Sequence, residues 1–151
     1  MAGAILDNIT SPVCVVTARS GDKINGMSVA WIMQGAFDPP YVVVSIAPER
    51  YSYSMITGSK MFGVNILASD QIKLGKHFGF ASGRNVDKFK KINHKLSKNK
   101  LPILENIYSY IECTLINIYN AGDHDLFIGD PIDRFTDDTK KPLIFRSSDY
   151  F

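Results

Sequence analysis

The sequence lacks the patterns of a disulfide-rich or metal-binding protein. It has two cysteines in 151 residues, Cys14 and Cys113, and neither belongs to a Cys-x-x-Cys pair. Both lie in apolar, strand-like runs, so we interpret them as buried free thiols in a reducing compartment. The three histidines have neither the mutual spacing nor the cysteine neighbours of a zinc site. The sequence therefore predicts no metal centre.

Long hydrophobic runs and targeting segments are also missing. No apolar run approaches the roughly 20 residues that a membrane helix needs. The first ten residues, MAGAILDNIT, have neither the basic start nor the apolar stretch of a signal peptide. We therefore expect a cytoplasmic protein with no membrane partner.

Common nucleotide-binding and acyl-transfer motifs are absent as well. There is no G-x-G-x-x-G after a strand, no G-x-x-x-x-G-K-[ST] and no G-x-S-x-G. The formal net charge of +2 is too small to indicate a nucleic-acid partner by itself. With 45% hydrophobic and 21% charged residues, the composition is that of a folded globular protein, and the length fits one domain over residues 1–151.

What the chain does contain is a series of strand-length apolar runs, mostly at hairpin spacing. A turn at Ser20-Gly21-Asp22 separates the first two runs, and short helices are expected at 52–57, ending at Gly58, and from 69–71 onward. Hairpins without regular strand–helix alternation favour an antiparallel β-barrel with inserted helices over a parallel sheet. The predicted strands are 12–17, 24–33, 41–47, 61–67, 109–119, 126–129 and 142–146.

The segment FGFASGRNVDKF, residues 78–89, concentrates donors suited to an anion. Ser82 has a hydroxyl, Gly83 can expose its backbone amide, Arg84 has a forked guanidinium, and Lys88 adds a point charge. Such a set suits a terminal phosphate. The alternative is a solvated loop in which an asparagine or aspartate caps a short helix.

Residues 88–100 carry six lysines and His94 but no acid. A solvated, mobile face and a nucleic-acid patch are the two interpretations of such a run. We favour the first and expect no nucleic-acid partner.

Three positions combine a core-like context with polar or aromatic chemistry. The strand within INGMSVAWIMQGAFDPP, residues 24–40, contains Ser28 and the only tryptophan, Trp31, and Ser45 interrupts the apolar run 41–47. Each position suits either a barrel core or a strand lying against a flat ligand. His124, in the turn AGDHD, is either an exposed polar residue or a hydrogen-bond donor over the barrel mouth.

Taken in order, these segments resemble the flavin reductase-like family, the FMN-binding split barrels that include flavoredoxins and ferric reductases. The resemblance implies a mainly β fold, a six-stranded antiparallel Greek-key split barrel with inserted helices. It also implies a homodimer with FMN near the subunit interface. The matching pieces, between Pro12 and Phe145, are PVCVVTA, GDKINGMSVAW, DPP, VVVSIAP, FGVNIL, SGR with DKF, IEC, GDHDLFIGD and PLIF.

The resemblance also implies which residues border the cofactor. The strands at 26–31 and 45–47 would line the flavin ring, and His124 would be the catalytic residue at the nicotinamide side. The cofactor-binding residues implied are Gly26, Met27, Ser28, Val29, Ala30, Trp31, Ser45, Ile46, Ala47, Ser52, Ser54, Asn65, Leu67, Ser82, Gly83, Arg84 and Lys88.

The activity implied is reduction of bound FMN by NAD(P)H, as in flavin or ferric reductases. The alternative is an electron carrier that exchanges electrons with a redox protein partner and has no nicotinamide site of its own. The chain departs from the family pattern at Gly129-Asp130-Pro131, where Pro131 predicts a bend or a sheet edge, and at Ala30, where many relatives carry a small polar residue.

Overall fold

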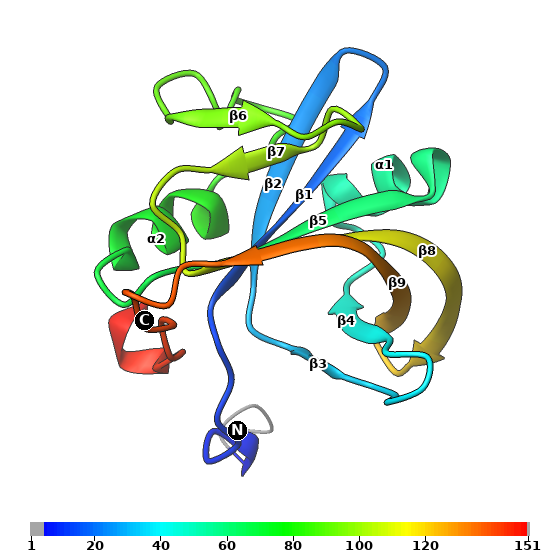
Figure 1. Cartoon of the computed structure of the whole chain (residues 1–151), viewed down its shortest axis with the longest axis horizontal. Coiled ribbons are helices and arrows are strands. Elements are labelled where there is room, and N and C mark those ends of the chain that lie inside the picture. The colour runs from blue at the N-terminus through cyan, green and yellow to red at the C-terminus, as the bar shows by residue number, and fades with distance from the viewer. Residues whose placement is uncertain (1–4, 151) are drawn as a thin grey trace.

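The computed structural model describes residues 5–150, which form nine β-strands, two α-helices and a short 3-10 helix (Figure 1). The elements, in chain order, are β1 (Cys14–Ser20), β2 (Lys23–Val29), β3 (Ile32–Gln34), β4 (Val42–Ile46), α1 (Tyr51–Ser59), β5 (Met61–Ile66), α2 (Ile72–Phe80), β6 (His94–Leu96), β7 (Pro102–Leu104), β8 (Ser109–Ala121), β9 (His124–Thr136) and η2 (Ser147–Asp149).

Seven strands form one antiparallel sheet in the order β2-β1-β5-β8-β9-β4-β3. Its two edge strands, β2 and β3, are consecutive in the sequence and separated only by Ala30 and Trp31. The sheet must therefore curl until its edges meet, and the Ser45 amide, which donates to the Trp31 carbonyl at 3.0 Å, extends the β3–β4 pairing up to this junction. The predicted mainly β, antiparallel split-barrel fold is confirmed.

The strand count differs from the six that the family resemblance implied and from the seven runs predicted from the sequence. The expected strand 24–33 is divided into β2 and β3, because the chain has to pass from one sheet edge to the other at Ala30-Trp31. A separate two-stranded ribbon, β6 with β7, was not predicted, since each strand has only three residues. The predicted strand 142–146 is reduced to isolated bridges at Pro142 and Ile144.

The β1–β2 hairpin and the long β8–β9 hairpin agree with the sequence-based expectations. Ser20 pairs with Lys23 across the predicted turn, and Ala121 pairs with His124 across the other. Pro131 lies opposite Cys113, beside a register shift in β8–β9, as expected for a residue that cannot donate to the ladder.

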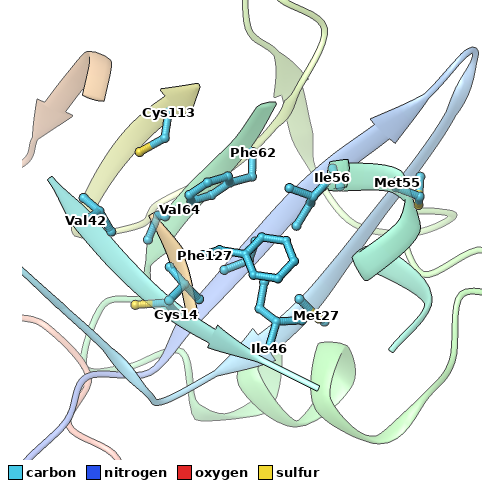
Figure 2. Packing of buried hydrophobic residues seen from close by; sticks show 13 residues of the cluster. Cys14, Met27, Val42, Ile46, Met55, Ile56, Phe62, Val64, Cys113 and Phe127 are labelled. Carbon is cyan, nitrogen blue, oxygen red and sulfur yellow. The ribbon is translucent and has the colours of Figure 1, made fainter. Parts of the chain in front are cut away.

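Strand β1 is buried on both faces because it separates two apolar clusters. Cys14 and Val16 face the barrel interior, whereas Val13 and Val15 face a second cluster under α2 and the ribbon. Figure 2 shows the interior cluster, with Met55 and Ile56 of α1 closing it. Both cysteines are buried as predicted, and burial raises the pKa of each thiol to about 12.

The helices connect the barrel to the rest of the chain. Helix α1 continues past the predicted stop at Gly58 and ends at Ser59, followed by Lys60 in the left-handed conformation. Helix α2 packs across β2. Neither α-helix among residues 5–150 has the length and apolar character needed to cross a bilayer.

Candidate functional site

Two adjoining hollows lie beside the place where the sheet edges meet. The first, which we call the strand hollow, has a volume of about 140 Å³, and the second, the basic hollow, about 280 Å³. Met27 and Arg50 line both. The strand hollow is lined by Met27, Ser28, Val29, Ala30, Trp31, Ser45, Ile46, Ala47, Arg50 and His124. The basic hollow is lined by Asn25, Met27, Glu49, Arg50, Tyr51, Ser52, Gly79, Phe80, Ala81, Ser82, Gly83, Arg84 and Lys88.

Strand β2 turns its backbone toward the strand hollow. As an edge strand it pairs only with β1, so alternate residues present their N–H and C=O groups on its open side. The Lys88 ammonium donates to the Gly26 carbonyl at 2.9 Å, which identifies Gly26 as facing that side. By the two-residue alternation, the backbone of Ser28 faces the same way.

On the side-chain faces of β2, Ser28 and Gly26 both contact helix α2 or make room for it. The Ser28 hydroxyl donates to the Gly75 carbonyl of α2 at 2.6 Å. A Cβ on Gly26 would lie 3.0 Å from Phe78, so a larger residue here would require the Phe78 ring of α2 to shift away from β2. A ligand in the strand hollow would therefore contact the backbone groups of β2 and the small side chains near the end of the strand.

Trp31 and His124 form the outer wall of the strand hollow. Trp31 is 60% exposed, so it does not belong to the barrel core, and its ring centroid lies 4.8 Å from that of His124. His124 Nδ1 lies 2.8 Å from the Asp123 carboxylate, which lowers the pKa of that carboxyl. With Nδ1–H donating to the carboxylate, Nε2 is the free ring nitrogen.

The turn that carries His124 is anchored to α1. Tyr53 donates its hydroxyl to Asp125 at 2.6 Å, and Asn120 donates to the other carboxylate oxygen at 3.1 Å. These hydrogen bonds lower the pKa of the Asp125 carboxyl. The β8–β9 turn is thereby held over the strand hollow by the helix that begins in the basic hollow.

Three segments converge on the basic hollow. Asn25 of β2 donates to the buried Ser52 hydroxyl of α1 at 2.8 Å. The loop after α2 lies against both: a Cβ on Gly83 would overlap the Asn25 side chain and lie 2.8 Å from the Tyr51 ring. Only glycine allows this approach. The Arg84 amide in turn donates to the Ser82 hydroxyl at 3.2 Å.

Three basic side chains, Arg50, Arg84 and Lys88, line the hollow together with one acid, Glu49, so its net charge is positive. Helix α1 begins here with no side-chain cap and no acid in its first turn, so its N-terminal partial charge is exposed to the hollow. Arg50 is its N-cap residue. Arg84 holds its guanidinium 5.2 Å from the Tyr51 ring centroid and donates to the Glu49 carbonyl at 3.0 Å.

Lys88 is the buried member of this cationic group. It is 3% exposed and donates to the carbonyls of Gly26 at 2.9 Å and Phe78 at 3.1 Å. An ammonium has three N–H donors, so one remains for a ligand in the basic hollow. Burial, with repulsion from Arg50, lowers the pKa of Lys88 to about 8.

Most residues predicted for the cofactor line one of the two hollows, and four do not. Gly26 lies beside them and reaches the site through its carbonyl. Ser54 is exposed on α1. Asn65 is buried and bonds the backbones of Val15 and Leu104, and Leu67 belongs to the second apolar cluster.

Arg50, Tyr51 and Asn25 also line the basic hollow, although they were not predicted from the sequence. The sequence did contain a signal for Arg50. This basic residue lies at the start of a helix that follows a strand closely, and that position places it beside the end of the strand. Asn25 carried no comparable signal, because its role depends on the contact with Ser52 and Gly83.

A profile of the flavin reductase like domain matches residues 6–151. The chain belongs to this family. The family predicted from the sequence is thus confirmed, and membership supports flavin-linked redox chemistry as the class of function.

Individual relatives agree with the family assignment. A flavin reductase of Pseudomonas putida is 32% identical over 150 residues, which cover 97% of this chain and 85% of that protein. The high molecular weight rubredoxin of Moorella thermoacetica is 36% identical over 126 residues, 82% of this chain. The chain spans only 55% of that relative's length. In structure, an FMN-binding protein from Thermus thermophilus has a TM-score of 0.85 at 27% identity, covering 94% of this chain and 85% of that one.

Proposed function

We propose that this protein is an FMN-binding oxidoreductase that reduces its flavin with NAD(P)H. The observation that carries the proposal is the junction of the two hollows at Met27 and Arg50. One hollow has strand walls suited to a planar ring, and the other has the charge suited to a phosphate.

The basic hollow fits the phosphate end of FMN by its donor set. A phosphate of charge near −2 needs several converging donors, and here the α1 N-terminus, Arg50, Arg84 and the third N–H of Lys88 converge. The Ser82 hydroxyl adds a neutral donor. The bound phosphate would also relieve the repulsion between Arg50 and Lys88 that lowers the pKa of Lys88.

The strand hollow fits the ring end. The open backbone edge of β2 at Ser28 offers donors and acceptors to the polar rim of a ring, and Ser45 to Ala47 form the opposite wall. Trp31 and His124 would leave one face of the bound flavin ring open, and a nicotinamide ring would stack on that face. FMN, when bound, supplies the redox chemistry, and the protein supplies binding and orientation. His124 would present Nε2 as a hydrogen-bond acceptor toward the nicotinamide.

The purified protein tests this proposal directly. We expect a flavin absorbance spectrum and release of FMN, identified by its mass. We also expect rapid bleaching of the bound flavin by NADH or NADPH in anaerobic stopped-flow mixing. A protein that neither carries nor takes up FMN would refute the proposal.

The second candidate is an electron carrier without a nicotinamide site. It is favoured by the relative from Moorella, whose name describes a rubredoxin. Stopped-flow mixing separates the two candidates, because a carrier would keep its flavin oxidised in the presence of NADH and NADPH. It would be reduced only by a protein donor.

We also propose a homodimer. Trp31, Met33 and Phe37 are large, exposed and near one another in the sequence at the sheet edge beside the strand hollow. Exposed apolar groups gathered in this way mark an interaction surface, and a second copy covering them would narrow the hollow. Analytical ultracentrifugation should give twice the chain mass, and Met33→Glu with Phe37→Glu should give the monomer.

A further inference from the structure

The charges of this protein are strongly segregated along the chain. Residues 71–100 contain nine of its 17 basic residues and only one of its 15 acids. The rest of the chain is therefore net acidic, although the protein as a whole is close to neutral. The flavin site accounts for two of the nine, Arg84 and Lys88, and leaves the others without a role.

Five of these lysines lie on one projecting feature, which we call the basic ribbon (residues 90–100, with β6). Their ammonium groups, those of Lys90, Lys91, Lys95, Lys98 and Lys100, are exposed. Across residues 5–150, no carboxylate lies within 4.0 Å of any of them. The ribbon appears at the upper left of Figure 1, apart from the sheet edge that carries β3. Its positive charge is thus unneutralised within the described chain.

A large hollow of about 710 Å³ opens beside the basic ribbon. Its apolar part includes Ile103, Ile107 and Phe135, and Lys95 and Lys140 supply cationic groups around it. Lys95 Nζ lies 5.8 Å from the centre of the Phe135 ring. An apolar centre with a charged rim is the composition of a protein interface rather than of a purely solvated face.

Two acids, Glu105 and Asp137, also line this hollow and equal its two lysines in number. The Asp137 carboxylate already accepts bonds from the Thr139 amide at 3.0 Å and the Thr139 hydroxyl at 2.6 Å. Glu105 is the other acid. The rim of the hollow is therefore of mixed charge, and the excess positive charge of this surface comes from the other exposed lysines of the basic ribbon.

The basic ribbon is continuous with the flavin site through one loop. Lys90 and Lys91 follow Lys88 after one residue, Phe89, and the Lys88 carbonyl accepts a hydrogen bond from His77 Nε2 of α2 at 2.7 Å. A partner seated on the ribbon would contact the segment that also carries the phosphate-binding residues.

We propose that the basic ribbon and its hollow dock an acidic protein electron carrier, which takes electrons from the flavin; this rests on the proposed function. Two electrons enter as hydride from NAD(P)H and leave singly, so that two one-electron carriers are reduced for each FMN reoxidised. The flavin's protons go to solvent. A nucleic acid would also be attracted to the lysines, but its phosphates would make no favourable contact with the apolar centre of the hollow.

The test uses the FMN-loaded protein and a purified rubredoxin of net negative charge. Calorimetric titration should show binding that weakens about tenfold between 50 and 300 mM salt, since exposed charges are screened over that range. Lys91→Glu with Lys95→Glu should weaken binding tenfold or more. The matched double reversal Lys60→Glu with Arg146→Glu lies outside residues 71–100 and should change it less than about twofold.

Bleaching of FMN by NAD(P)H, measured before rubredoxin is added, should be the same in all three proteins. Its absence would refute the proposed function by itself. Equal rubredoxin binding by the ribbon variant and the parent, or no binding by either, would overturn the docking surface. Binding of a single-stranded oligothymidylate that only the ribbon variant loses, without rubredoxin binding, would assign the surface to nucleic acid instead.

Discussion

Single residues decide how the two hollows are joined. Arg50 is the N-cap of α1, lines both hollows and lies close enough to Lys88 to depress its pKa. His124 stands at the opposite end, with Nδ1 engaged by Asp123 and its ring beside Trp31. We therefore expect Arg50 to affect the affinity for FMN and His124 to affect the rate of flavin reduction.

We expect Arg50→Met to weaken FMN binding roughly 10- to 100-fold, because a charge-assisted bond to a phosphate is worth about 1.5–3 kcal/mol. Fluorescence titration with FMN measures the dissociation constant. Arg146→Met, which removes an exposed charge far along the chain, is the control and should leave it unchanged. Equal affinity in the Arg50 variant would exclude the assigned phosphate contact.

Loss of the imidazole should act on the reduction step. We expect His124→Ala to slow bleaching of bound FMN by NAD(P)H more than it weakens FMN binding, since the ring lines the outer wall of the strand hollow. Stopped-flow reduction and FMN titration of the same preparation give the two numbers. An unchanged reduction rate would remove His124 from the proposed mechanism.

At the level of elements, the basic hollow exists because β2, the start of α1 and the loop after α2 meet. The Asn25–Ser52 hydrogen bond joins the first two, and the close approach of Gly83 brings in the third. Lys88 then ties this loop to both β2 and the C-terminal end of α2. The loop is thus placed by contacts rather than by its own conformation.

Gly83→Ala tests that placement. The added methyl group would meet Asn25 and Tyr51, so the loop should shift and FMN affinity should fall about tenfold or more. The same substitution at Gly58, where a Cβ meets nothing within 4 Å, is the matched control. FMN titration of both variants decides the question, and similar affinities would show that the loop tolerates the methyl group.

For the whole molecule, burial of a charged lysine has a consequence for stability. The folded protein holds Lys88 at a pKa of about 8, against an ordinary value of 10.5. Between these pH values the unfolded chain binds more protons, so the charged Lys88 opposes folding below about pH 8. That penalty disappears as the pH rises toward 10.5.

The FMN-free protein should therefore gain free energy of unfolding, on the order of 2 kcal/mol, between pH 8 and pH 10.5 relative to Lys88→Met. Denaturant unfolding at several pH values measures the difference between the two proteins. The variant leaves two carbonyls without their donor and should be less stable throughout, so the test lies in the slope. Parallel pH profiles would contradict the lowered pKa.

The parts of the fold that were predictable are those that depend on local pattern. Runs rich in Val and Ile, such as 41–47, formed strands, and the turn at 20–22 formed a hairpin. Asn65 and Leu67 follow the same strand pattern, and nothing local shows that one bonds buried backbone while the other packs in the second cluster. The resemblance implied that Gly26 borders the cofactor, and no local pattern shows that a Cβ there would also lie 3.0 Å from Phe78.

The amino-acid sequence by itself determined the antiparallel β architecture, the hairpins and the family, because alternation, turn chemistry and ordered motifs are local properties. Only the tertiary structure decided where the sheet edges meet, that Trp31 lies outside the core, and that Arg50 joins two hollows. Those features depend on contacts between residues far apart in the chain. Such contacts are set by the curl of the whole sheet rather than by any one segment.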